Sequence, residues 1–349
     1  MKKGKATMKI TATIVVIGVT LAWQVSCAEA TFYRAAVGEF YPLPGHNESD
    51  AQHVLSVNLQ RIASLVGGAQ EQAVDILVLP EDALYNFLYF ATRDDLYPFL
   101  VRLPALGTPL CATGASRREA GVDVLKELGC MARAASLVIV VDVGEREDCS
   151  ASALDCPADG RYQYNTQIVV DETGALLSRY RKYHLFPEDY TVFDRPALEL
   201  VSFRTSFGVR FGQAICFDLF FRAPILALAQ DGVRDFVFST YWENDGTIPP
   251  ITATALQQGV SRAAAANLLG ANIGYGKYSS GSGIYARGEP LAAFFCPIPS
   301  WHDTRLLVSE VPVAAPPAEP RARLVAPPIV WGGDVSSFPA EWRGSSAAL

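Results

Sequence analysis

Short, continuous apolar runs alternate with amphipathic helical patterns along most of this sequence. Asp75–Leu79 and Leu137–Val143 have the length and composition of buried central strands. Ser49 or Asp50 is expected to cap a helix between residue 49 and the first of these runs. The apolar face of that helix recurs at helical spacing through Val54, Leu55, Leu59, Ile62 and Val66. The alternation predicts an α/β protein rather than an all-β sandwich or a helical bundle.

The remaining elements are expected to continue this alternation. Strands are predicted at Thr31–Gly38, Val209–Cys216, Asp235–Ser239, Leu269–Ile273, Gly283–Tyr285, Leu291–Phe294 and Leu306–Val311. Helices are predicted at Val122–Ala135, Pro224–Gln230 and Thr252–Asn267. Tyr164–Val170 and Ala175–Tyr180 flank the turn sequence Asp171–Gly174 and predict a hairpin. A hairpin requires antiparallel neighbours, so the sheets are expected to be mixed.

The N-terminus has the pattern of a secretory signal peptide. Four lysines within the first nine residues precede the apolar run Ile10–Trp23, which is short for a membrane span. Ala28–Ala30 then fits the small-x-small cleavage rule, so the mature chain is expected to begin at Thr31 and to be secreted. An uncleaved anchor is the alternative. We therefore divide the chain into a leader at 1–30, a domain at 31–312 and a Pro-rich segment at 313–349.

The composition and charge of the chain limit the classes of molecule that it is expected to bind. The formal net charge is −7 and the isoelectric point is near 5.2, which argues against nucleic acid and anionic membranes. No later stretch is long and apolar enough to span a membrane. Asn47-Glu48-Ser49 is a glycosylation sequon in a polar loop, so Asn47 is a candidate acceptor. Oligomeric state cannot be inferred from these features.

The number and spacing of the cysteines also indicate whether the chain is expected in an oxidising compartment. Loss of Cys27 with the leader would leave six of the seven cysteines, and six could form three disulfides in an oxidising compartment. Cys149 and Cys156 bracket a short polar loop and form a natural local pair. Cys111 and Cys130 flank a segment that ends in a predicted helix and could form a second. Two cysteines in very different surroundings remain, Cys216 and Cys296.

Three chemically distinct polar residues follow apolar strand runs: Glu81, Lys182 and Cys216. The carboxyl ends of strands form the usual ligand crevice of α/β sheets, so neighbouring strands would bring these side chains together. A thiol attacks a carbonyl as thiolate, a buried carboxylate can remove its proton, and an ammonium stabilises the developing negative charge. Backbone N–H groups of Phe217 or Asp218 can donate to the same oxyanion.

Other readings of these residues remain open. Spacing alone does not show that the three side chains meet, and a buried cysteine at a strand end is often a small hydrophobe. His184 lies close to Lys182 and suggests a Cys–His dyad, although a histidine in a surface turn is the simpler interpretation. None of the four histidines has the spacing of a metal site, so zinc-dependent hydrolysis is not expected.

Several motifs around these positions resemble the nitrilase superfamily, and within it the vanin (pantetheinase) and biotinidase family. The matching stretches are Leu79–Ala83, Asp159–Thr166, Arg179–Lys182 with Leu185–Phe186, Phe211–Asp218 and Gly281–Tyr285. The resemblance extends from about Thr31 to Val311. It implies a four-layer αββα sandwich, a Glu81–Lys182–Cys216 triad and an acyl-thioester intermediate resolved by water without a cofactor. It also implies a small linear amide as substrate, such as pantetheine or a biotinyl amide.

The resemblance further implies roles for residues near the triad. Glu188 matches a second glutamate that supports the site, and Tyr85, Trp242 and Glu243 are expected to line the substrate pocket. Glu243 stands where the family usually has an apolar residue, so the acyl specificity is open. The segment beyond about Val313 would be a tail or a stub of the family's C-terminal domain. A catalytically inactive binding protein on the same scaffold is the alternative to an enzyme.

Overall fold

Six strands form a mixed sheet in which an early strand pairs with the last one. The computed structural model describes residues 32–86, 90–112, 123–150, 155–187, 191–243, 252–276, 278–296 and 304–313. The strand order of this first sheet is β12-β1-β2-β3-β4-β5. Its strands are β1 (Phe32–Glu39), β2 (Ile76–Val78), β3 (Val138–Asp148), β4 (Arg161–Val170), β5 (Leu176–Arg181) and β12 (Arg305–Pro312).

The second sheet also has six strands, in the order β11-β10-β9-β8-β7-β6. Its strands are β6 (Ser202–Arg204), β7 (Arg210–Ile215), β8 (Asp235–Thr240), β9 (Asn267–Asn272), β10 (Ser282–Ala286) and β11 (Glu289–Phe294). The central strands β7, β8 and β9 are parallel, while β6, β10 and β11 pair antiparallel with their neighbours. Both sheets are therefore mixed, as the predicted hairpin required.

The two sheets stack face to face because their strands are apolar on both sides. In β3, Val138 and Val140 point into the cluster between the sheets, and Ile139 and Val141 point to the opposite face. The inner cluster continues into the second sheet through Phe211, Val237, Leu269 and Ile284. Alternate residues of a strand lie on opposite faces, so a continuous apolar run is what a sheet buried on both sides requires.

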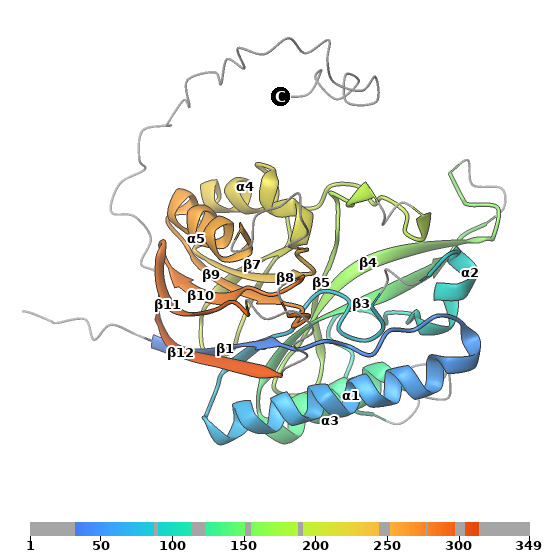
Figure 1. Cartoon of the computed structure of the whole chain (residues 1–349), viewed down its shortest axis with the longest axis horizontal. Coiled ribbons are helices and arrows are strands. Elements are labelled where there is room, and N and C mark those ends of the chain that lie inside the picture. Colours follow the sequence, from blue (N-terminus) through green and yellow to red (C-terminus); the bar gives the residue numbers. More distant parts are fainter. Residues whose placement is uncertain are drawn as a thin grey trace, which may run out of the picture. The chain divides into compact units, whose positions relative to one another are not determined.

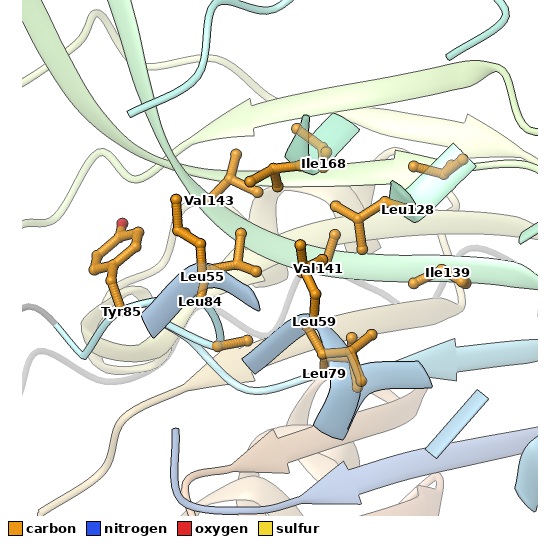
Figure 2. Packing of buried hydrophobic residues seen from close by; sticks show 14 of the residues in the cluster. Leu55, Leu59, Leu79, Leu84, Tyr85, Leu128, Ile139, Val141, Val143 and Ile168 are labelled. Carbon is orange, nitrogen blue, oxygen red and sulfur yellow. The ribbon is translucent and has the colours of Figure 1, made fainter. Parts of the chain in front are cut away.

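Helices cover the two outer faces. On the first sheet, α1 (Glu48–Glu71) and α3 (Val124–Ala135) pack against the outward residues of β3, and Figure 2 shows the α1 leucines over them. On the second sheet, α4 (Ile225–Gln230) and α5 (Thr252–Ala264) pack over β7 to β10. The layers run helices, sheet, sheet, helices (Figure 1), so the predicted αββα sandwich is confirmed. Short helical turns complete the elements: α2 (Arg93–Leu96), η2 (Tyr97–Phe99) and η4 (Cys216–Phe220).

Most predicted elements occur, with differences at their ends. The N-cap of α1 is Asn47 rather than Ser49 or Asp50, because its side chain accepts the N–H of Ser49 while Asp50 accepts the N–H of Asn47. The helix predicted to reach Asn267 ends at Ala264. Ala265 has a left-handed φ of 49°, and the chain then enters β9.

Two disulfides occur in the described chain, at the pairs that the sequence suggested. Cys149–Cys156 closes the loop between β3 and β4, and Cys111–Cys130 ties α3 to the segment before it. β3 and β4 stay paired up to the loop that Cys149–Cys156 closes. Both strands are therefore longer than the apolar runs from which they were predicted. Cys216 and Cys296 are both buried, and neither forms a disulfide among the described residues.

Several predictions fall on residues that the structure does not describe. The leader at 1–30, most of the Pro-rich segment at 313–349, and Glu188 lie outside the described residues. Their assignments therefore stay predictions. Within the described part, no helix is both long and apolar enough to cross a membrane.

Candidate active site

Glu81, Lys182 and Cys216 each follow the carboxyl end of a strand. Glu81 comes three residues after β2, Lys182 directly after β5, and Cys216 directly after β7. β2 is parallel to β3, and β5 is antiparallel to β4, which is itself antiparallel to β3. β2 and β5 therefore end at the same edge of the first sheet. The second sheet supplies the cysteine.

Glu81 and Lys182 form a buried ion pair. Nζ of Lys182 lies 2.7 Å from Oε1 of Glu81, and each side chain is only 1% exposed. Nδ2 of Asn165 donates to the same oxygen at 2.9 Å, and the backbone N–H of Tyr241 donates to Oε2 at 2.8 Å. The carboxylate thus receives donors from β4, from the residue after β5 and from the residue after β8. These contacts fix its position without any exposed side chain.

Cys216 occupies a strained turn beside this pair. It is the first residue of η4, has a positive φ of 39° and is 8% exposed. Its Sγ donates to the carbonyl of Tyr241 at 3.7 Å, so the thiol and the Glu81 carboxylate contact opposite ends of the same residue. A non-glycine residue in this region of φ persists only where its surroundings hold it there. Such residues cluster at functional sites.

The electrostatics of the thiol follow from this placement. Burial raises the pKa of Cys216 well above its usual range, the negative charge of Glu81 raises it further, and the positive charge of Lys182 opposes both. The resting cysteine is therefore a neutral thiol at neutral pH. A thiol in this state can act as a nucleophile only if a base removes its proton. Glu81 is the carboxylate whose negative charge raises the pKa of Cys216.

The two residues after the cysteine differ from each other. The Phe217 ring is half-buried and lies 5.3 Å from the ring of Phe186. The Asp218 side chain is fully buried, and its carboxylate accepts the Ile215 N–H at 3.0 Å. The sequence singled out only the backbone N–H groups at these positions. The Asp218 carboxylate is a feature that it did not reveal.

His184 is not the surface-turn residue that we expected. Its Nδ1 lies 2.8 Å from Oδ1 of Asp218, and its ring stacks on Phe221 with centroids 3.8 Å apart. This nitrogen is engaged by a carboxylate rather than by the thiol of Cys216. The structure therefore gives no support to a Cys–His dyad, and it places the histidine in a network beside the triad.

The predicted pocket residues have different environments. Tyr85 is fully buried in the core under α1, beside Phe90 and Phe99, so it serves packing and does not fit the role of a pocket wall (Figure 2). Trp242 lies in the same small buried cluster as Cys216, and its Nε1 has no hydrogen-bond partner among the described residues. Glu243 is exposed and borders residues 244–251, which are outside the description.

Two contributors to the site were missed by sequence reasoning. Asn165 belongs to the Asp159–Thr166 block, which served only as a mark of resemblance, and Tyr241 contributes through its backbone.

Asn47 is exposed and caps α1, so the sequon asparagine is accessible. Within the described residues, no three His, Cys, Asp or Glu side chains group in a way that could hold a metal ion.

Comparison with known proteins decides the family. Residues 51–268, well over half of the 349, match the sequence profile of the carbon-nitrogen hydrolase family. The chain belongs to the carbon-nitrogen hydrolase family. The match contains all three strand-end residues and the nucleophile turn, so the family assignment rests on the region that builds the site.

Curated relatives of this chain include pantetheinases and biotinidases. A pantetheinase from Sus scrofa is 37% identical over 267 residues, which are 75% of this chain and 51% of the relative. A biotinidase from Mus musculus is 34% identical over 279 residues, covering 76% of this chain and 52% of the relative. The chain thus spans about half the length of the curated relatives it matches. The resemblance inferred from the motifs is confirmed.

Solved structures confirm the fold of the chain. An amidase of the nitrilase superfamily from Nesterenkonia AN1 aligns with a TM-score of 0.57 at 20% identity, covering 81% of this chain and 92% of that chain. Saccharomyces cerevisiae Nit3, a member of branch 10 of the nitrilase superfamily, aligns with a TM-score of 0.59 at 18% identity, over 80% and 90% of the two chains. At these identities the likeness supports the architecture alone.

Proposed function

We propose that this chain is a thiol amidohydrolase that cleaves a linear amide C–N bond. Glu81 is the general base, Lys182 the electrostatic partner and Cys216 the nucleophile. The observation that carries the proposal is the convergence of a buried carboxylate–ammonium pair and a buried free thiol from two different sheets. The family membership and the pantetheinase and biotinidase relatives support the same reaction class.

Acylation begins when Sγ of Cys216 attacks the amide carbonyl carbon. The Glu81 carboxylate takes the S–H proton as the S–C bond forms, and the carbonyl π electrons move to the oxygen. The Lys182 ammonium and the backbone N–H groups of Phe217 and Asp218 stabilise this oxyanion. The tetrahedral intermediate collapses, the C–N bond breaks, and the carboxylic acid of Glu81 returns the proton to the leaving amine.

Deacylation repeats the sequence with water as nucleophile. Glu81 removes one proton from water while the water oxygen attacks the thioester carbonyl. The C–S bond then breaks, and the sulfur regains the proton from Glu81 to restore the neutral thiol. The products are a carboxylic acid and an amine, and the site returns to its resting charge. No redox partner is required.

Pantetheine is the proposed substrate, and a biotinyl amide is the alternative. The pig pantetheinase and the mouse biotinidase are similar to this chain to nearly the same extent, so identity alone does not separate the two. Side-by-side incubation with pantetheine and biocytin, with detection of the released amine and acid, distinguishes them. We expect release from pantetheine; release from biocytin alone would contradict the assignment.

Substitution of the nucleophile tests the chemistry independently of substrate choice. Cys216→Ala and Cys216→Ser should abolish turnover while the circular dichroism spectrum and unfolding midpoint stay close to those of the wild type. A thiol-reactive amide analogue should label Cys216 in the native protein, as located by peptide mass spectrometry. Labelling of Cys296 alone would favour the inactive binding protein, and full activity of Cys216→Ala would show that Cys216 is not the nucleophile.

We also propose that the mature chain is secreted. The two disulfides and the accessible sequon asparagine support an oxidising, glycosylating compartment. Expression of the complete sequence in a secretory host should release protein whose N-terminus is Thr31 and whose mass falls after removal of N-linked glycans. Retention of residues 1–30 on a membrane-bound product would show instead that the leader is an anchor.

A further inference from the structure

The carboxylate of Asp218 is the centre of a buried hydrogen-bond network. Oδ2 accepts the hydroxyl of Tyr180 at 2.8 Å and the backbone N–H of Ile215 at 3.0 Å. Oδ1 faces Nδ1 of His184 at 2.8 Å and accepts the backbone N–H of the same residue at 3.2 Å. The Asp218 side chain is 0% exposed. A buried carboxylate with four such contacts has one preferred position.

The residues that make these four contacts flank Lys182 and Cys216 in the sequence. Tyr180 lies two residues before Lys182, and His184 lies two residues after it. Ile215 lies directly before Cys216, and Asp218 itself lies two residues after that cysteine. The carboxylate therefore ties the end of β5 in the first sheet to the turn after β7 in the second.

The turn at the nucleophile needs such support. Cys216 has a φ of 39°, a conformation that costs roughly 1–3 kcal/mol for a non-glycine residue and persists where neighbours hold it. The bond from the Ile215 N–H to Asp218 spans this residue and closes the turn. Tyr180 also packs in the small buried cluster that contains the thiol.

We propose that Asp218 is a positioning residue that sets the placement of the Cys216 thiol relative to Lys182. Tyr180 and His184 are the donors through which it does so. This inference rests on the proposed triad, and it adds three side chains that act through the placement of Cys216 and Lys182. Loss of a donor should let the two strand ends shift relative to each other while both sheets remain intact.

Tyr180→Phe is the sharpest test because the chain offers a matched control. The hydroxyl of Tyr33 also donates to a buried aspartate, Asp235, at 2.8 Å, and that bond likewise links a strand of the first sheet to a strand of the second. Tyr33 and Asp235 lie at the start of β1 and β8, whereas the triad lies past the ends of β2, β5 and β7. Tyr33→Phe therefore removes the same kind of bond away from the site.

The readout is the rate at which iodoacetamide alkylates Cys216 in the native protein, measured by peptide mass spectrometry. We expect Tyr180→Phe to slow alkylation about tenfold and to lower kcat by about 10- to 100-fold with little change in KM, because a small misplacement of a reacting group costs rate. Tyr33→Phe should leave both within about twofold of the wild type. Equal effects of the two variants, or no effect of Tyr180→Phe, would overturn the proposal.

A pair of substitutions at His184 separates positioning from packing. His184→Asn keeps a donor near the position of Nδ1, whereas His184→Ala removes it. We expect His184→Asn to recover most of the alkylation rate that His184→Ala loses, and equal rates in the two variants would contradict the role of the donor. The alkylation rate needs no substrate. If the wild type cleaves neither pantetheine nor biocytin, only the proposed substrate is lost, and the positioning role is still decided by the alkylation rates.

Discussion

At the scale of single residues, the site is defined by how completely the Glu81 carboxylate is held. Its two oxygens receive a side-chain ammonium, a side-chain amide and a backbone N–H from three separate segments of the chain. A base held this way needs no rearrangement before it accepts the thiol proton. Preorganisation of this kind is a main source of rate in enzymes.

Glu81→Gln should reduce kcat by about 10²- to 10⁴-fold, because an amide cannot take the proton of Cys216. The substitution preserves size, so the unfolding midpoint should change little. Steady-state kinetics on the substrate identified above measures the loss. Activity within tenfold of the wild type would remove Glu81 from the role of base.

Asn165→Leu should lower kcat by about 10-fold or more, because it removes the donor at 2.9 Å that orients the carboxylate of Glu81. Asn267→Leu is the matched control: its Nδ2 donates at 2.7 Å to the buried carboxylate of Asp235, outside the site. Both variants should lose stability in urea, and only the first should lose turnover per folded molecule. A parallel loss of turnover in the control would show that the effect is structural.

The sequence predicted Glu81, Lys182 and Cys216 as the candidate catalytic residues, but it did not predict the contacts that hold them. Strand-end placement and motif resemblance led to these three, since each lies next to an apolar run, and their catalytic roles stay predictions. The role of Asn165 depends on the register of β4 against its neighbours, and that of Asp218 on a contact between two sheets. Neither a register nor an inter-sheet contact is present in local sequence. The burial of Tyr85 in the core under α1 likewise depends on tertiary packing.

At the scale of elements, α1 illustrates how an amphipathic pattern becomes a covered sheet. Its buried positions, including Leu55, Leu59 and Ile62, recur every three or four residues. Figure 2 shows Leu55 and Leu59 over the outward side chains of β3. Neighbouring positions on the helix face solvent, so adjacent residues contribute very differently to stability.

Leu59→Ala should lower the free energy of unfolding by about 2–5 kcal/mol, because it opens a cavity between α1 and the first sheet. Gln60→Ala, at the adjacent exposed position, should change it by less than about 0.5 kcal/mol. Urea unfolding followed by circular dichroism compares the two. Similar small changes in both variants would mean that α1 contributes little to the core.

Element ends were the weakest part of the sequence-based prediction. The helical pattern continued through the alanines before Asn267, and only the left-handed turn at Ala265 ends α5. The N-cap of α1 is Asn47 rather than the predicted Ser49 or Asp50, because the reciprocal hydrogen bonds between Asn47 and Asp50 favour Asn47 at this position. Helix propensity varies little among such candidates, so tertiary contacts decide the boundary.

At the scale of the whole molecule, the sequence predicted the alternation of strands and helices, but it did not assign the strands to the two sheets. Buried polar side chains help to join the two sheets, and Glu39 is the most telling. It ends β1, is 1% exposed, and accepts hydrogen bonds from Ser280, Gly281 and Ser282 at the start of β10. Burial raises its pKa to about 7, although these hydrogen bonds act in the opposite direction.

This carboxyl group makes stability depend on pH. Its ordinary pKa is 4.5, so between about pH 4.5 and 7 the folded protein holds a proton that the unfolded chain has released. Stability from this group is therefore fully present below pH 4.5 and is lost as the pH rises to about 7. Asp235, whose pKa burial raises to about 6, acts in the same direction.

Glu39→Gln should make the free energy of unfolding less dependent on pH, because the amide cannot ionise. We expect the decrease between pH 4.5 and pH 8 to shrink by on the order of 3 kcal/mol relative to the wild type. Urea midpoints at the two pH values measure it. Glu310→Gln, at an exposed carboxylate on β12, is the control and should leave the pH dependence unchanged.

The pairing of β1 with β12 has a consequence for folding during synthesis on the ribosome. β1 lies between β2 and β12, with Phe32 opposite Pro312 and Glu39 opposite Arg305. Roughly 270 residues must be translated after β1 before this partner exists, which takes roughly 15–50 s at about 5–20 residues per second. Throughout that interval one side of β1 has no native partner and is open to association with other chains. Shielding of this strand during synthesis would therefore govern the yield of folded protein.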